Sequence, residues 1–154
     1  MKLVVDEPGS KEARTTVKSL LRDGFSLYTV DIALAESLNA VWKHAIIHRD
    51  LKMEEVEPTV HDLIRIYDAV SVVSTRELSG EAVKIALTEN INIYDSVYVA
   101  AAMKLKATLI TADKKLYDAS KRMVPARTIL VDSTSSKLES LEQEVRAEKR
   151  LQAV

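Results

Sequence analysis

Two patterns of apolar residues alternate along the chain. Short runs rich in Val, Ile and Thr predict strands, and longer stretches with apolar residues every three or four positions predict amphipathic helices. The predicted strands cover 1–5, 25–28, 71–74, a short segment that ends at Thr111, and 128–131. The predicted helices cover 11–22, 31–49, 56–69, 78–89, an Ala-rich segment with Asp95 in its first turn, and 114–123.

This alternation of short strands with helices of ten or more residues predicts an α/β fold. We expect a three-layer arrangement, in which one parallel sheet has helices on both faces. Right-handed crossovers would bring the carboxyl ends of the strands to one edge of the sheet. The predicted helix at 31–49 is expected to bury one side, made of Leu34, Leu38, Val41, Trp42 and Ala45.

The chain divides into a domain at 1–133 and a helical extension at 134–154. The extension is charged and free of Gly, with a thin apolar stripe at Leu138, Leu141 and Val145. Such a stripe can lie on its own domain or dock on a second subunit. A stripe too thin for a core and too regular for a solvated tail predicts that the helix contributes to a homodimer.

Composition excludes several classes of protein. The chain has no Cys, which removes disulfides, thiolate chemistry and Cys-bound zinc. No apolar run reaches the roughly 18 residues of a membrane helix, and residues 1–6 are too short for a signal peptide, so we expect a cytoplasmic protein. The net charge of −1 means that only a local patch could hold a polyanion. Candidates are Lys114, Lys115, Lys121 and Arg122, and also Lys43, His44, His48, Arg49 and Lys52.

Two acids stand where an α/β fold places ligand-binding groups. Asp95 lies in the first turn of a predicted helix, and Asp113 directly follows a predicted strand. Ligands bind beyond the carboxyl ends of the strands in such folds, and the amino end of a helix is electropositive. Either Asp can instead serve only to start a helix. Glu36 lies beside the apolar stripe of its helix, from where it can lean into the same cleft or stay in solvent.

Three segments, 35–43 around Glu36, 94–102 around Asp95 and 109–116 around Asp113, resemble in order and spacing the PIN-domain family of metal-dependent ribonucleases. The likeness covers about residues 6–132 and is closest to the toxin of VapBC-type toxin–antitoxin pairs. It implies that Glu36, Asp95 and Asp113 match the second, third and fourth acids of the family's active site. Thr111 matches the small hydroxyl residue that supports them.

The first acid of the family pattern is matched less well. Family members usually have an Asp at the end of the first strand and a short helix after it, whereas here Asp6 directly precedes the turn at Glu7–Ser10. Residues 1–6 are either a first strand with a deletion behind it, or the tail of a segment whose strand is missing. We favour the first reading because Lys2–Val5 is a good strand sequence.

Converging carboxylates repel one another, so a cluster of them is stable mainly around a cation. Oxygen ligands without Cys select Mg²⁺ or Mn²⁺, which can activate a water and assist hydrolysis of a phosphodiester. The resemblance implies an endoribonuclease that acts on RNA, pairs as a homodimer and is neutralised by an antitoxin protein. The alternative is a catalytically weak PIN-like binding or assembly module that lacks the first acid.

Other chemistries find less support in the chain. His44 and His48 have the i, i+4 spacing of two metal ligands, but the intervening residues lack the Glu of a zinc-protease motif and no third ligand is evident. There is no GlyXSerXGly elbow, no GlyXGlyXXGly loop and no Walker pattern.

Overall fold

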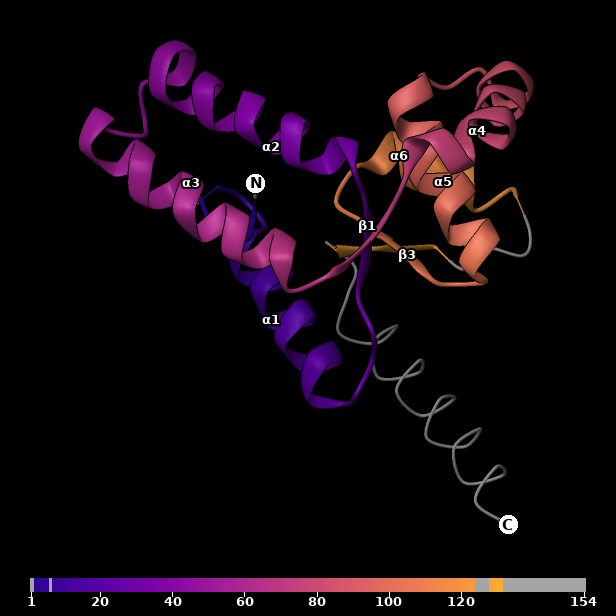
Figure 1. Ribbon diagram of the computed structural model, residues 1–154, viewed down its shortest axis with the longest axis horizontal. Helices are drawn as coiled ribbons and strands as arrows, with labels where there is room; N and C mark the ends of the chain where they lie inside the picture. The colour runs from indigo at the N-terminus through magenta and orange to yellow at the C-terminus, as the bar shows by residue number, and fades with distance from the viewer. Residues whose placement is uncertain (1, 6, 124–127, 132–154) are drawn as a thin grey trace.

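The structure, a computed structural model, describes residues 2–5, 7–123 and 128–131 (Figure 1). Its helices are α1 (Ser10–Arg22), α2 (Ile32–Lys43), the π-helix η1 (His44–His48), α3 (Met53–Asp68), α4 (Thr75–Glu89), α5 (Ile93–Leu105) and α6 (Lys114–Ser120). Its strands are β1 (Tyr28–Val30), β2 (Ser71–Val73), β3 (Leu109–Thr111) and β4 (Thr128–Leu130). The predicted α/β class is confirmed.

The strands of the described residues form two parallel pairs. β1 pairs with β2, so that Val30 lies opposite Val73. β3 pairs with β4, so that Thr111 lies opposite Leu130. The described strands therefore make two small parallel sheets and not the single continuous sheet that we predicted.

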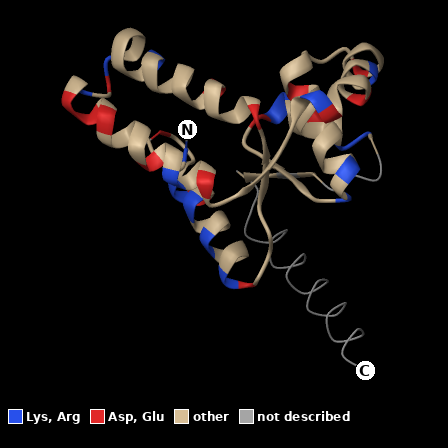
Figure 2. Ribbon diagram, in the orientation of Figure 1, with Lys and Arg blue, Asp and Glu red and all other residues tan. Residues whose placement is uncertain are grey.

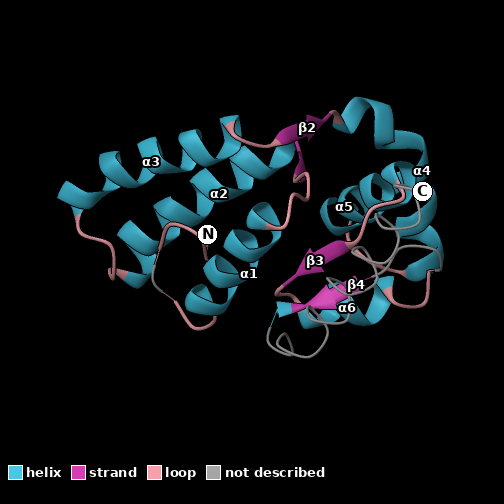
Figure 3. Ribbon diagram, turned by 90° about the horizontal axis from the view of Figure 1, so that it is seen from below, coloured by secondary structure: helices cyan, strands magenta, loops and turns pink. Residues whose placement is uncertain are grey.

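The helices gather into two groups around these strands. Helices α1, α2 and α3 lie together on one side, and α4, α5 and α6 lie on the other (Figures 1 and 3). α2 packs against α3, and α4 packs against α5. Helix α5 also contacts both β1 and β3, so it connects the two strand pairs.

The core lies between α4, α5 and the strands. α5 is apolar around most of its circumference, as expected of a helix that is covered on several sides. Its buried residues include Val99 and Ala100–Ala102, which meet Leu78 and Ala82 of α4. The small Ala side chains let the two helix backbones approach closely. The sequence thus places α5 at the centre of the fold.

Asp31 fixes the carboxyl ends of β1 and β2 to the start of α4. Its carboxylate accepts hydrogen bonds from the hydroxyl and from the backbone N–H of Thr75, the latter at 3.0 Å. Its own N–H donates to the carbonyl oxygen of Val73 at 3.1 Å. The Thr75 hydroxyl is the main reason why the pKa of Asp31 lies below its ordinary value. A side chain at a strand end can therefore be structural as well as functional.

The predicted strand at 1–5 is wrong, because residues 2–5 form turns. Ser10, the first residue of α1, is buried and binds back to this segment. Its hydroxyl donates to the carbonyl oxygen of Val5 at 2.8 Å and accepts from the N–H of Glu7 at 3.0 Å. The chain is thereby folded back upon the start of α1. Asp6 lies outside the described residues, as does the predicted extension at 134–154.

Several boundaries also differ from the sequence prediction. The strand expected at 25–28 lies at Tyr28–Val30, because Phe25–Leu27 continue the irregular segment that follows Gly24 at φ 82°. α4 begins three residues early, where the Ser74 hydroxyl accepts from the N–H of Arg76. α3 begins at Met53, with Glu55 bonded back to the N–H of Lys52, so Pro58 lies inside the helix.

The predicted buried face of 31–49 is only partly correct. Val41 is buried, whereas Leu38 and Trp42 are exposed, Trp42 to 51%. The helix continues into η1, where Ile46 and Ile47 are exposed too. Among the described residues α2 packs mainly against α3, and this packing leaves Leu38, Trp42, Ile46 and Ile47 exposed. No helix of the described residues is both long and apolar enough to cross a membrane.

We expect Leu78→Ala to lower the free energy of unfolding by about 2–5 kcal/mol, because it leaves a cavity in the α4–α5 core. Leu78 is 2% exposed. The matched control is Leu87→Ala on the same helix, where the side chain is 81% exposed and the expected change is within about 0.5 kcal/mol. Urea unfolding followed by circular dichroism measures both, and equal midpoints would contradict the assigned core.

Candidate metal centre

Asp95 lies in the first turn of α5, as predicted, and Asn92 holds it there. The side-chain carbonyl of Asn92 accepts the N–H of Asp95 at 2.8 Å and so caps the helix. The Asn92 amide group donates to Oδ2 of Asp95. Ser96, fully buried next to Asp95, donates to the Asn92 carbonyl oxygen at 2.9 Å. The half-buried Asp95 carboxylate is therefore held by its own helix end.

Asp113 lies two residues after the end of β3, also as predicted, and it caps α6. Its Oδ1 accepts the N–H groups of Lys115 at 2.7 Å and of Leu116 at 3.1 Å. Thr111 supports this turn, since its hydroxyl accepts the N–H of Asp113 at 3.0 Å. The side chain of Asp113 is nevertheless exposed, so the capping role leaves its Oδ2 open to a ligand.

Glu36 projects from α2, and a residue of α5 holds it. The hydroxyl of Tyr98 donates to Oε2 of Glu36 at 2.6 Å, across 62 positions of sequence. Tyr98 lies three residues after Asp95 and therefore on the same side of α5. The pKa of Tyr98 is raised well above its ordinary value by burial and by the neighbouring Glu36, so its hydroxyl keeps its proton.

The charges of the three acids act on one another. Burial raises the pKa of Asp95, the negative charge of Asp113 raises it further, and Glu36 adds to this effect. The hydrogen bond from Asn92 opposes the shift. The amino end of α5 also favours a negative charge, yet burial and the two like charges outweigh it. Asp95 is thus within electrostatic reach of both Glu36 and Asp113.

The three carboxylates share one arrangement. Each has one oxygen bonded to a neutral donor of the protein, namely Asn92, Tyr98 or the backbone at the start of α6. Within the described part of the chain, no Lys, Arg or His forms an ion pair with Glu36, Asp95 or Asp113. The second oxygen of each acid therefore has no protein cation to neutralise it.

These donors suit a hard divalent cation. Mg²⁺ binds oxygen ligands, keeps several waters and commonly takes one or two carboxylates from the protein. No three His, Asp or Glu side chains of the described residues converge closely enough to hold an ion together. The residues therefore suit an ion that is bound by one or two of the three acids, with water as its remaining ligands. Asp6, the fourth acid considered for this site, lies outside the described residues.

Positive charge near these acids comes from the start of α6. Lys114 and Lys115 directly follow Asp113 and are exposed. Lys121 is engaged with Asp118, which leaves it less available to a polyanion. The other charges that we considered, on and beyond α2, lie at the far end of that helix (Figure 1).

The structure adds a further basic surface that the sequence analysis missed. Lys11, Arg14, Lys18 and Arg22 follow one face of α1, where Figure 2 shows a run of blue. Their spacing of i, i+3, i+7 and i+11 is readable in the sequence. A scan of each helix for charged stripes, alongside the apolar ones, would have found them.

His44 lies close to two acids and beside His48. His44 Nδ1 lies 2.9 Å from Oδ1 of Asp50, and its Nε2 lies 3.9 Å from Glu7. His44 and His48 lie with their ring centres 5.3 Å apart. No third ligand joins them in the described residues. His44 instead ties the turn before α1 to the end of α2.

Asn92 and Tyr98 are the site residues that sequence reasoning missed. Asn92 had a local signal, since an Asn three residues before an Asp in a helix's first turn is a capping pattern. Tyr98 had none, because its partner lies 62 positions away.

The comparison with known families settles the class of the protein. The PIN domain family matches residues 2–122, which covers all three acids. The chain belongs to the PIN domain family. PIN domains are generally nucleases that act on RNA and usually use divalent metal ions. No curated protein matches this chain significantly.

The family assignment gives the acids a common context. Glu36, Asp95 and Asp113 come from α2, from the start of α5 and from the end of β3, and all lie within the matched residues. The negative charges of both other acids raise the pKa of Asp95. The family's use of divalent ions agrees with the all-oxygen donor set of this PIN domain.

The raised pKa of Asp95 predicts the sign of a stability effect. Folding strengthens proton binding by Asp95, so the free energy of unfolding falls as pH rises from the unfolded pKa of about 3.9 through the raised folded value. In EDTA, Asp95→Asn should therefore be more stable than the unsubstituted protein above this window, and the gain should vanish below it.

Urea midpoints measured across this pH range test the effect. Asp118→Asn is the matched control of opposite sign, because Lys121 holds the pKa of Asp118 below its ordinary value. That substitution should cost stability at neutral pH and cost nothing once the pH is below the pKa of folded Asp118. An Asp95→Asn protein less stable than the unsubstituted one at neutral pH would contradict the electrostatic coupling of the three acids.

Proposed function

We propose that this PIN domain is a metal-dependent endoribonuclease that hydrolyses RNA phosphodiester bonds. The observation that carries the proposal is the shared arrangement of Glu36, Asp95 and Asp113, in which each acid is held by one oxygen and has no cationic partner among the described residues. Mg²⁺ or Mn²⁺ bound there would supply a water of lowered pKa and positive charge for the phosphate oxygens.

The protein's own residues have distinct tasks in this proposal. Asp95 would hold the ion with its second oxygen, together with one of its two neighbours, Glu36 or Asp113, and water would fill the remaining positions. Thr111 fixes the turn that carries Asp113. Lys114 and Lys115 would hold the RNA phosphates beside the acids, because the chain's net charge of −1 provides no general attraction.

A second candidate function has an observation of its own. Residues 2–5 form turns, so the strand that would end at Asp6 is missing from the described residues. This favours the reading in which the first acid of the family pattern is lost. The domain would then bind RNA or protein with weak activity or none. The position of the Asp6 carboxylate separates the two functions. A distance within about 8 Å of Asp95 and Asp113, the span of a shared ion, would support the nuclease, and a longer one the binding module.

The finer parts of the proposal come from the VapBC likeness. We propose a cytoplasmic toxin-type nuclease in which an antitoxin segment covers the three acids. We also propose that its strands and helices form the three-layer arrangement that the sequence predicts. The exposed Trp42, Ile46 and Ile47 supply apolar area for a partner protein.

We expect RNA cleavage that requires Mg²⁺ or Mn²⁺, stops in EDTA and resumes when the ion is restored. Asp95→Asn and Asp113→Asn should each lower the rate at least about a hundredfold, the scale of losing one electrostatic contact in the transition state. Asp118→Asn, an acid of α6 that pairs with Lys121, is the control and should cleave normally. Cleavage of a labelled single-stranded RNA measures all four proteins.

Two results would contradict the nuclease proposal. Cleavage that survives EDTA would show that no metal ion is needed. Full activity in Asp95→Asn would show that the Asp95 carboxylate is not needed. No cleavage by any of the proteins, together with RNA binding by the unsubstituted chain, would instead support the binding module.

We expect a homodimer to which the stripe Leu138, Leu141 and Val145 contributes. Burying three such side chains would give about 4–9 kcal/mol before the costs of association, so other apolar contacts must assist them. Changing all three to Ser should raise the dimer dissociation constant, as measured by analytical ultracentrifugation. Leu87→Ser, at an exposed position of α4, is the control. A monomeric unsubstituted chain would reject the dimer.

A further inference from the structure

The bond between Tyr98 and Glu36 joins the two helices that carry acids of the site. The phenol oxygen and Oε2 are 2.6 Å apart, which is the short separation of a hydrogen bond to a charged acceptor. Tyr98 lies one turn beyond Asp95, so the same face of α5 presents one acid and the donor that holds another.

The two partners of this bond differ in mobility. Tyr98 is half-buried and packs against the core, between the buried neighbours Val97 and Val99. Glu36 is an exposed side chain with three rotatable bonds. A fixed donor can therefore select one rotamer of a mobile carboxylate, whereas the reverse is not possible.

We propose that Tyr98 is a positioning residue that holds Oε2 of Glu36 and leaves Oε1 to face a divalent cation shared with Asp95. This inference rests on the proposed function, because it assigns Tyr98 a task at the same acids. Losing a donor that orients a metal-binding carboxylate commonly weakens metal binding by about 10- to 100-fold.

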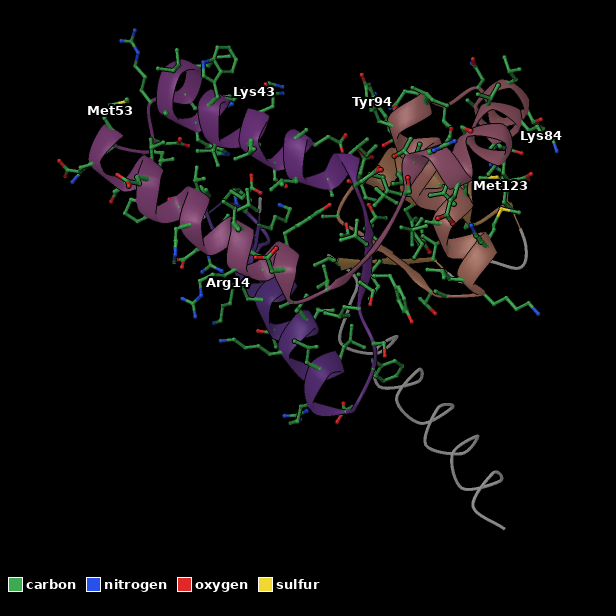
Figure 4. All side chains as sticks on the ribbon, viewed as in Figure 1. Arg14, Lys43, Met53, Lys84, Tyr94 and Met123 are labelled. Carbon is green, nitrogen blue, oxygen red and sulfur yellow. The ribbon has the colours of Figure 1, made fainter. Side chains whose placement is uncertain are left out.

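The test is binding of Mn²⁺ in the absence of RNA, measured by isothermal titration calorimetry on the full chain. Tyr98→Phe keeps the ring and its packing and removes only the hydroxyl. We expect its Mn²⁺ affinity to fall by about 10- to 100-fold, the usual effect of losing a residue that orients a ligand. The matched control is Tyr94→Phe, one turn earlier on α5 and 58% exposed (Figure 4), which should bind normally.

A double substitution separates positioning from a purely structural role. In a Glu36→Gln background, Tyr98→Phe should cause no further loss of affinity, because the carboxylate that it orients is gone. A similar loss in both backgrounds would mean that Tyr98 acts by other means and would overturn the proposal. Unfolding temperatures in EDTA show whether each variant is folded at the temperature of the titration.

A second variant covers the case in which Tyr98→Phe does not fold. Glu36→Asp keeps the charge but draws it back by one methylene from the Tyr98 hydroxyl, and it should weaken Mn²⁺ binding over a comparable range. Unchanged affinity in this variant, or in a folded Tyr98→Phe, overturns the positioning role alone. Absence of Mn²⁺ binding by the unsubstituted protein overturns the proposed function, and this inference with it.

Discussion

The packing of α5 between α4 and the two strand pairs is the constraint on which the candidate site depends. α5 contacts β1 and β3, which belong to different sheets, and its Ala residues let α4 approach closely. Its amino end carries Asp95, and its next turn carries Tyr98. Any shift of α5 against the strands would therefore move one acid directly and a second, Glu36, through its hydrogen bond. The core and the site are mechanically one unit.

The same packing explains why the pKa of Asp95 is raised. Asp113 and Glu36 are exposed, so water screens their charges, whereas Asp95 is half-buried beside them. Burial is the largest cause of its raised pKa, and the like charge of Asp113 is the next. Repulsion among three nearby carboxylates lowers the stability of the fold when no cation is bound. Sites that bind a cation usually carry this cost.

The parts of the fold that the sequence predicted well are those governed by local chemistry. The Ala-rich run of α5 and the strand-to-turn change at Thr111–Asp113 were both readable, because burial on several sides and helix capping leave local patterns. The strand at 1–5 failed because hydrogen bonds between a nearby side chain and the backbone outweighed its β propensity. The buried Ser10 hydroxyl holds the Val5 carbonyl and folds the segment back on α1. The β1 boundary failed because a three-residue strand has too short a pattern to fix its ends.

Capping and ligand binding are not competing explanations for the acids. A carboxylate has two oxygens, and in Asp113 the helix end uses Oδ1. Asn92 likewise uses one oxygen of Asp95, and Tyr98 uses one of Glu36. The capping bonds restrict how each acid can rotate, and this restriction directs the remaining oxygen. A helix-start role read from sequence is therefore the means by which this chain could orient a ligand, and Tyr98 supplies the same restraint where α2 offers no helix end for Glu36.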